Sequence, residues 1–265
     1  MFRLIKRIFR KNSPSKTSRE VFDILFNSPV GILDFHDPYG DRCNGLSDEG
    51  FSFVEIGPVC PSPARERFGF KSADEIAEHL RGKRSHRAFI AANICKNHDT
   101  DIESAAADYL HCFNILYDYV DMFIVNVADK SNPGTTQLQD SEYLSDIVDR
   151  LIEQRLYCND FKPILIEISD SITRSDLDEI ISYVRSSGLD GIVCGNHAQV
   201  EHIASETKGR LTVISKHDFH SAGEAMKHLD AGATLIECTA QIRANSIRRR
   251  VRRCLRSRAK ARRRS

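Results

Sequence analysis

The chain has 265 residues, 41% of them hydrophobic, so it is long enough to bury a sizeable core in one or two domains. It contains no apolar run of about 18 residues, the length that a transmembrane helix needs. The net charge of +1 conceals a strong asymmetry. Residues 1–19 and 243–265 carry 19 of the 38 basic residues and no acidic one, which leaves the intervening body with a net charge of −18. Basic ends on an acidic body predict an anionic partner for the ends.

The first segment, MFRLIKRIFRK (residues 1–11), has basic amphipathic character. Phe2, Ile5 and Phe9 share one helical face, and Lys and Arg residues flank it. This pattern predicts a helix that lies on an anionic membrane, with a solvated tail as the alternative. Because basic residues interrupt the apolar stretch throughout, the segment is less typical of a secretory signal.

Cysteine usage indicates the compartment. The eight Cys residues form no C-x-x-C pair, and most lie in apolar segments. Such residues behave as small hydrophobic side chains in a reducing environment. We therefore expect a cytoplasmic protein, which residues 1–11 would hold at the inner face of a membrane if they bind one.

Eight apolar runs rich in β-branched residues follow along the body, and most are continuous rather than alternating. Continuous runs are typical of parallel strands that are buried on both faces. The predicted strands are Val30–Phe35, Phe53–Gly57, Ala88–Asn93, Met122–Ala128, Ile164–Ser169, Gly191–Asn196, Leu211–Ser215 and Thr234–Ala240.

Segments with helical spacing separate most of these strands. They are Ser72–Leu80, Ile102–Tyr117, Ser141–Leu156, Ser175–Ser186, Val200–Thr207 and Ser221–Ala231. The first has a capping-box pattern, because Ser72 is followed three residues later by Glu75. Alternating strands and helices predict an α/β fold, a (β/α)8 TIM barrel, with a doubly wound open sheet as the alternative.

The last segment is rich in arginine. Arg248–Arg264 contains Val251, Cys254 and Leu255, and nearly all the remaining residues are basic. Because the planar guanidinium group binds phosphate well, this segment predicts contact with lipid head groups or with nucleic acid. A solvated, partly helical tail is the alternative. The predicted organisation is thus a basic extension (residues 1–24), a barrel (25–242) and an Arg-rich tail (243–265).

Several ordered motifs support a family resemblance. The segment VNVADKSNPGTTQLQ (residues 125–139) resembles the V-N-I-S-S-P-N-T-P-G-L-R-x-L-Q motif of the class 2, quinone-dependent dihydroorotate dehydrogenases. Further similar segments lie at residues 28–41, 50–63, 67–72, 93–100, 209–219 and 229–240. The resemblance covers about residues 25–242. It implies a TIM barrel and an oxidoreductase of pyrimidine biosynthesis that uses FMN to oxidise dihydroorotate to orotate.

The resemblance also implies site residues. Asp129 stands at the position of the family's catalytic base, which is a serine there. The cofactor-binding positions Asn93, Asn126 and Asn196 are retained, although these side chains could equally satisfy backbone groups at strand ends. The substrate-binding positions are changed, because Lys71 and Ser131 each replace an asparagine.

Other positions depart further from the family pattern. Pro38 replaces an orotate-binding Lys, Glu167 replaces a flavin-contacting Lys, and residues 215–218 replace the glycine-rich G-V-G-G. A second glycine-rich phosphate-binding insertion is absent between His197 and Val200. We therefore expect FMN binding to be weak or lost, and a pseudoenzyme that acts as a binding or regulatory module at an anionic surface.

Two alternatives remain open from the sequence. The first is residual or altered flavin-dependent activity, with Asp129 as the base. The second is a barrel mouth repurposed for metal or acid–base chemistry, although the sequence contains no close metal-ligand spacing such as H-x-H. The residues expected there are His36, Asp37, Asp129, Glu167, His217 and Asp218.

Overall fold

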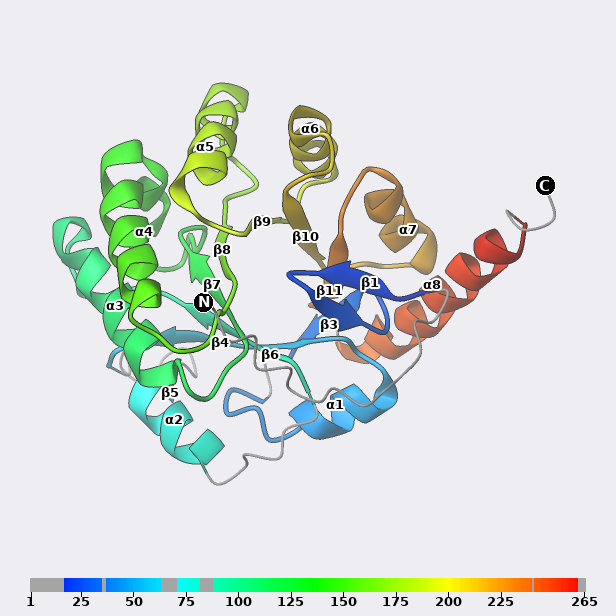
Figure 1. The fold of residues 1–265 in the computed structure, drawn as a ribbon, viewed down its shortest axis with the longest axis horizontal. Coiled ribbons are helices and arrows are strands. Elements are labelled where there is room, and N and C mark those ends of the chain that lie inside the picture. The colour runs from blue at the N-terminus through cyan, green and yellow to red at the C-terminus, as the bar shows by residue number, and fades with distance from the viewer. Residues whose placement is uncertain (1–16, 35–36, 63–70, 82–87, 240, 262–265) are drawn as a thin grey trace.

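A parallel β-barrel forms the centre of the protein (Figure 1). The computed structural model describes residues 17–34, 37–62, 71–81, 88–239 and 241–261. Within these ranges β3 pairs with both β4 and β11, which closes the sheet into a barrel of eight strands. The strands are β3 (Val30–Leu33), β4 (Val54–Cys60), β6 (Ile90–Ile94), β7 (Met122–Asn126), β8 (Ile164–Glu167), β9 (Gly191–Cys194), β10 (Thr212–His217) and β11 (Leu235–Cys238). All eight coincide with predicted strands, so the TIM-barrel prediction is confirmed.

Helices surround the barrel on its outer side (Figure 1). They are α1 (Cys43–Glu49), α2 (Ala73–Arg81), α3 (Ala105–Leu116), α4 (Ser141–Leu156), α5 (Arg174–Ser187), α6 (His197–Thr207), α7 (Ala222–Asp230) and α8 (Gln241–Ala261). Two short 3-10 turns, η1 (Ile102–Ser104) and η2 (Thr135–Gln139), precede α3 and α4. Helices α2 to α7 match the predicted segments, whereas α1 and the short strand β5 (Lys71–Ser72) were not expected from the sequence. None of the helices in the described ranges is both long and apolar enough to cross a bilayer.

The capping box at the start of α2 forms as predicted. The Ser72 hydroxyl accepts a hydrogen bond from the Glu75 backbone N–H, at 3.2 Å. In return, the Glu75 carboxylate accepts one from the Ser72 backbone N–H, at 3.0 Å. These bonds satisfy two donors that would otherwise be left unpaired at the helix start.

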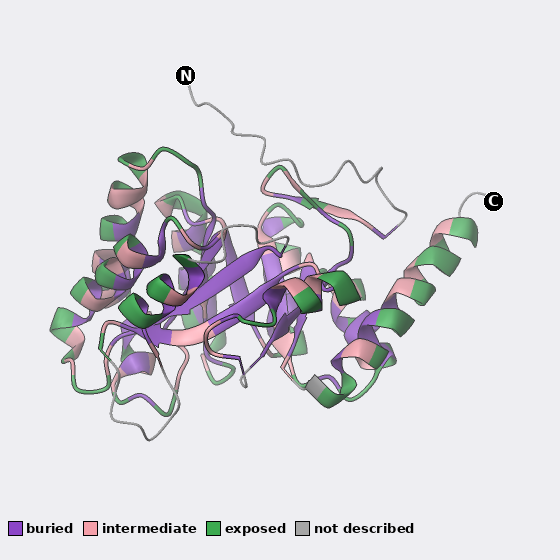
Figure 2. Cartoon of the chain, turned by 90° about the horizontal axis from the view of Figure 1, so that it is seen from below, coloured by how far each residue is buried: buried purple, intermediate pink, exposed green. Residues whose placement is uncertain are grey.

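The strands are mostly apolar because each buries both of its faces (Figure 2). Along β7, Met122 and Ile124 belong to the core inside the barrel, whereas Phe123 and Val125 belong to the core under the helices. Side chains alternate between the two faces of a strand, so every second residue of each strand points into the barrel. This alternation fixes which residues reach the carboxyl-terminal mouth.

A small hairpin packs against the amino-terminal end of the barrel core. It consists of β1 (Arg19–Val21) and β2 (Ile24–Phe26), which pair in antiparallel fashion through a two-residue turn. Phe26 is 2% exposed, and its ring contacts those of Phe53 and Phe89 edge to face, with centroids 6.5 and 5.0 Å away. The hairpin therefore adds an apolar plug to this end of the barrel. Residues 1–16, which include the predicted membrane-binding segment, lie outside the described residues.

The packing of the hairpin through Phe26 should contribute to the stability of the fold. Truncating Phe26 to Ala should lower the free energy of unfolding by about 3–5 kcal/mol, because it empties a large space between buried rings. Leu25 on the same strand is 36% exposed, so Leu25→Ala should change that free energy by less than about 1 kcal/mol. Urea unfolding of the two variants compares these values, and equal effects would show that the hairpin is not part of the core.

Candidate functional site

A ring of polar side chains occupies the barrel interior toward its carboxyl-terminal mouth. Each of these residues lies two positions after an apolar residue of the core inside the barrel. Because side chains alternate along a strand, its side chain also points into the barrel. The ring consists of Glu55 from β4, Asn93 from β6, Asn126 from β7, Glu167 from β8, Lys216 from β10 and Glu237 from β11. Their side chains are mostly or fully buried, so each needs a partner inside the barrel.

Lys216 bridges two of the carboxylates. Its Nζ lies 2.7 Å from Glu55 Oε1 and 2.9 Å from Glu167 Oε2, and its side chain is 12% exposed. Asn93 donates to the same two oxygens from Nδ2, at 2.9 and 2.6 Å. Two donors and two acceptors thus form a closed set of hydrogen bonds between β4, β6, β8 and β10.

The two asparagines continue this network toward the loop after β7. Asn126 Nδ2 donates to Asn93 Oδ1 at 3.0 Å. Asn126 Oδ1 in turn accepts the backbone N–H groups of Ala128 and Asp129, at 2.9 and 3.1 Å. The hydrogen-bonding groups of both retained asparagines are therefore largely engaged with the protein itself.

Burial and charge set the protonation of the ring. Burial raises the pKa of Glu167, the Lys216 ammonium opposes this shift, and the Glu55 carboxylate adds to it. For Lys216, burial alone lowers the pKa, but the carboxylates of Glu167 and Glu55 outweigh burial and raise the pKa above its ordinary value. Lys216 is therefore a stable cation and an unsuitable nucleophile.

Glu237 completes the ring as its third carboxyl group. Burial and then the neighbouring Glu55 raise the pKa of Glu237 well above its ordinary value. Both Glu237 oxygens and Glu55 Oε2 are buried and meet no donor among the described residues. A proton on Glu237 supplies the missing donor, because a protonated carboxyl group can hydrogen-bond to the Glu55 carboxylate.

The predicted base position lies in the loop after β7. One Asp129 oxygen accepts hydrogen bonds from the Ser131 backbone N–H and hydroxyl, at 2.8 and 2.6 Å. Asp129 and Ser131 thus contact each other, and Asn126 joins them to the ring. Of the predicted site residues, the structure therefore brings together Asn93, Asn126, Asp129 and Ser131.

The other predicted site residues lie elsewhere. Asn196 caps α6, where its side chain accepts the Ala198 backbone N–H at 2.9 Å. Lys71 lies on β5, with its Nζ 5.1 Å from the centre of the Tyr39 ring. Neither residue belongs to the ring.

The residues expected for a metal site at the mouth have other contacts. Asp37 accepts the backbone N–H groups of Asp41 and Arg42, at 2.7 and 2.6 Å. Asp218 pairs with Arg243 at 3.0 Å, and His217 lies 3.5 Å from Glu224. His36 lies outside the described residues. Among the residues that are described, no three His, Cys, Asp or Glu side chains are arranged to hold a metal ion.

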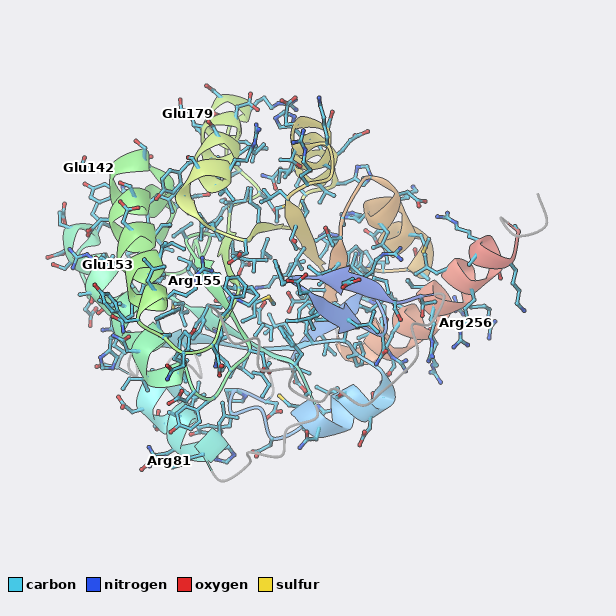
Figure 3. All side chains as sticks on the ribbon, viewed as in Figure 1. Arg81, Glu142, Glu153, Arg155, Glu179 and Arg256 are labelled. Atoms are coloured by element: carbon cyan, nitrogen blue, oxygen red, sulfur yellow. The ribbon has the colours of Figure 1, made fainter. Side chains whose placement is uncertain are left out.

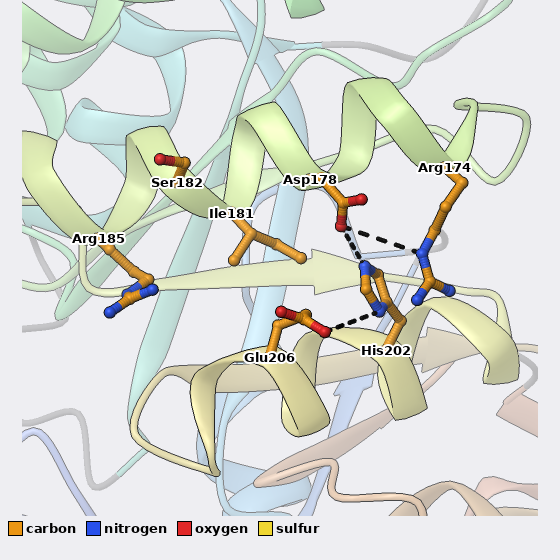
Figure 4. Close-up of a pocket in the computed structure, with 7 residues that line it drawn as sticks. All are labelled: Arg174, Asp178, Ile181, Ser182, Arg185, His202 and Glu206. Atoms are coloured by element: carbon orange, nitrogen blue, oxygen red, sulfur yellow. Dashed lines mark hydrogen bonds and ion pairs between the residues drawn. The ribbon is translucent and has the colours of Figure 1, made fainter.

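A groove of about 290 Å³ lies on the outer surface between α5 and α6 (Figure 4). Four of its polar side chains contact one another: Asp178 contacts both His202 and Arg174, and Glu206 lies 4.0 Å from His202. The groove lies outside the barrel, away from the polar ring.

The sequence of this chain matches a known protein family. The family model described as dihydroorotate dehydrogenase matches residues 65–202, which is more than half of the chain. The chain belongs to the dihydroorotate dehydrogenase family. A dihydroorotate dehydrogenase (quinone) of Christiangramia forsetii is 29% identical over an alignment of 268 positions, which covers 84% of this chain and 79% of the relative. One from Coxiella burnetii is 32% identical over 199 residues, covering 66% of this chain and 57% of the relative.

Solved structures agree on the fold. The dihydroorotate dehydrogenase of Eimeria tenella, crystallised with ferulenol, superposes with a TM-score of 0.78 and 17% identity. The match covers 91% of this chain and 82% of that protein. The named relatives are quinone-dependent, so the family resemblance of the sequence motifs is confirmed for the class 2 branch.

Two members of the ring, Glu55 and Glu237, are not among the residues that the sequence singles out. The signal that could have found them is the alternation of the strands. In the runs FVEI, IAANI, IVN, LIE, ISK and LIE, a polar residue lies two positions after an inward apolar one. Reading all strands together in this way would have placed both carboxylates beside Lys216.

Lys216 should be essential for the stability of the ring. Replacing it with Met removes the cation between buried carboxylates, and we expect the free energy of unfolding at neutral pH to fall by about 3–5 kcal/mol. The double variant Lys216→Met with Glu167→Gln should recover part of this loss, because it also removes one unpaired charge. Urea unfolding measures both, and a double variant no more stable than the single one would contradict the bridge.

His228 should make stability depend on pH. His228 is 5% exposed, and its Nδ1 lies within hydrogen-bond distance, 2.7 Å, of the Ser215 hydroxyl. Burial, with His197 and His217 nearby, lowers the pKa of His228 from 6.5 to about 4. The unfolded chain therefore binds a proton at this site before the folded chain does, and stability falls as the pH drops from 6.5 to about 4. Urea unfolding across this range should show a shallower pH dependence for His228→Gln, but not for the exposed control His220→Gln.

Proposed function

We propose that this member of the dihydroorotate dehydrogenase family does not carry out the FMN-dependent oxidation of dihydroorotate, and that it acts as a binding or regulatory module at an anionic surface. The observation that carries the proposal is the bridge from Lys216 to Glu55 and Glu167 inside the mouth. Glu167 stands where the family pattern has a flavin-contacting lysine, and Lys216 stands where it has the valine of G-V-G-G. The chain's own side chains thus satisfy groups that would otherwise face a ligand.

The loops at the phosphate end of the expected flavin site do not fit an FMN phosphate. After β9, the Gly195 backbone N–H donates to Asp170 Oδ1 at 3.2 Å. After β10, the His220 backbone N–H donates to the Glu224 carboxylate at 2.7 Å. Backbone N–H groups are the usual donors to a bound phosphate, and carboxylates that already occupy them also repel a second anion.

The base position supports the same proposal. One oxygen of the Asp129 carboxylate accepts two hydrogen bonds from Ser131, and the Asp129 backbone N–H donates to Asn126 Oδ1. A general base needs a free acceptor directed at the substrate proton. One Asp129 oxygen instead closes a turn of its own loop, so Ser131 rather than a ligand orients this carboxylate.

The basic ends supply the binding part of the proposal. Residues 1–11 are proposed to contact an anionic membrane from the inner, cytoplasmic side, and Arg248–Arg264 are proposed to contact phosphate groups. The acidic body supports this assignment, because a net charge of −18 between the two ends leaves them as the parts that attract an anion.

The visible spectrum of the purified protein tests the proposal. We expect no stoichiometric flavin band and no dihydroorotate-dependent reduction of a quinone analogue. The relative from Christiangramia forsetii, purified in the same way, is the positive control. A yellow protein with about one FMN per chain would overturn the proposal. So would activity that falls by about 10²-fold or more in Asp129→Ala, the loss typical of removing a general base.

A further inference from the structure

The outward face of α8 forms a continuous basic stripe. Arg249, Arg253, Arg256 and Lys260 follow one another at intervals of four, three and four residues, and all are exposed. Residues at this spacing lie on one face of a helix. At about 1.5 Å per residue the stripe extends roughly 16 Å. Figure 3 marks Arg256 on the part of α8 that projects from the barrel.

The opposite face of α8 is part of the barrel. Ala244, Ile247 and Val251 are at most 3% exposed and belong to the core under the helices. Val251 lies two positions from both Arg249 and Arg253, a rotation of roughly 200° at 3.6 residues per turn. The packed face therefore fixes the stripe so that it points away from the protein.

The charges of the stripe are not neutralised by the protein. Two other arginines of α8 form ion pairs with acidic residues. Arg243 pairs with Asp218, and Arg258 forms two hydrogen bonds with Asp230, at 2.5 and 3.0 Å. Among the described residues, no acidic side chain lies within ion-pair distance of the four stripe residues. A row of four unpaired cations on a body of net charge −18 is complementary to a polyanion.

We propose that this stripe binds the phosphate backbone of double-stranded nucleic acid. This inference deepens the proposed binding function and rests on it only for the role of the basic C-terminus. A duplex carries one negative charge per about 1.7 Å of axis, so a stripe of roughly 16 Å meets several phosphates. The major groove of B-form DNA is about 12 Å wide and admits an α-helix.

The structure favours a duplex over the other polyanions. A helix that binds a membrane interface inserts an apolar face, but the apolar face of α8 is packed on the barrel. Ile242, at the helix start, is the exposed large hydrophobic residue on α8 within the described residues. Single strands are bound by aromatic side chains that stack on the bases, and α8 contains no aromatic residue. Because arginines that contact phosphates carry no sequence information, binding should be independent of sequence.

The test measures binding of the full chain to a labelled, mixed-sequence DNA duplex by fluorescence anisotropy across a series of salt concentrations. The stripe variant replaces Arg249, Arg253, Arg256 and Lys260 with Gln. Each neutralised phosphate contributes about 0.9 to the slope of log K against log salt, so the variant should reduce the slope by about 3 to 4. Its affinity should fall at least about tenfold at low salt.

A matched variant controls for net charge. It replaces Arg81, Arg150, Arg174 and Arg185 with Gln, four exposed arginines on other helices, and should change the affinity by less than about twofold. Unlabelled single strand serves as competitor, and binding of phosphatidylglycerol vesicles is compared between the wild-type chain and the stripe variant. Equal losses in the two variants, no duplex binding by the wild-type chain, stronger competition by single strand, or a loss of vesicle binding in the stripe variant larger than its loss of duplex binding would each overturn the proposal. The visible spectrum of the same preparation reports separately on the loss of flavin chemistry, so the two proposals fail independently.

Discussion

Two buried carboxylate oxygens, Glu55 Oε1 and Glu167 Oε2, hold the mouth of this barrel together because two donors share them. Lys216 and Asn93 each donate to both oxygens, so four strands are joined by one compact set of bonds. Moving charges of this kind out of water is unfavourable unless each has a close partner. The surrounding structure therefore depends on all four groups being present, and a change at one of them requires changes at the others.

This constraint explains why the departures from the family pattern occur as a set. A lysine expected on β8 is a glutamate, and a valine expected on β10 is a lysine. Each change alone would leave a buried charge without a partner, whereas together they form an ion pair of 2.9 Å. Glu237 adds a third carboxyl group, and burial and the neighbouring Glu55 raise its pKa well above the ordinary value.

Much of the fold follows from local sequence, because short continuous apolar runs rich in β-branched residues are typical of strands buried on both faces. The eight barrel strands and helices α2 to α7 fall where the patterns place them. The hairpin at Arg19–Phe26 was not expected, since three-residue strands carry no clear periodicity. The candidate site was harder to predict, because Lys216 and Glu55 are 161 residues apart and only the closed barrel brings them together. Asn196 illustrates the converse, since it is retained from the family pattern but caps a helix here.

Helix α8 runs without Gly or Pro from Gln241 to Ala261. The residues that pack on the barrel and the residues of the basic stripe therefore belong to one continuous helix. Like charges four residues apart, such as Arg249 with Arg253 and Arg256 with Lys260, each destabilise a helix by about 0.2–0.5 kcal/mol. An anion bound to the stripe reduces this repulsion and stabilises helix α8. Ile247 and Val251 of the same helix pack in the core under the helices. Binding of an anion to the stripe and the stability of the barrel are therefore thermodynamically linked.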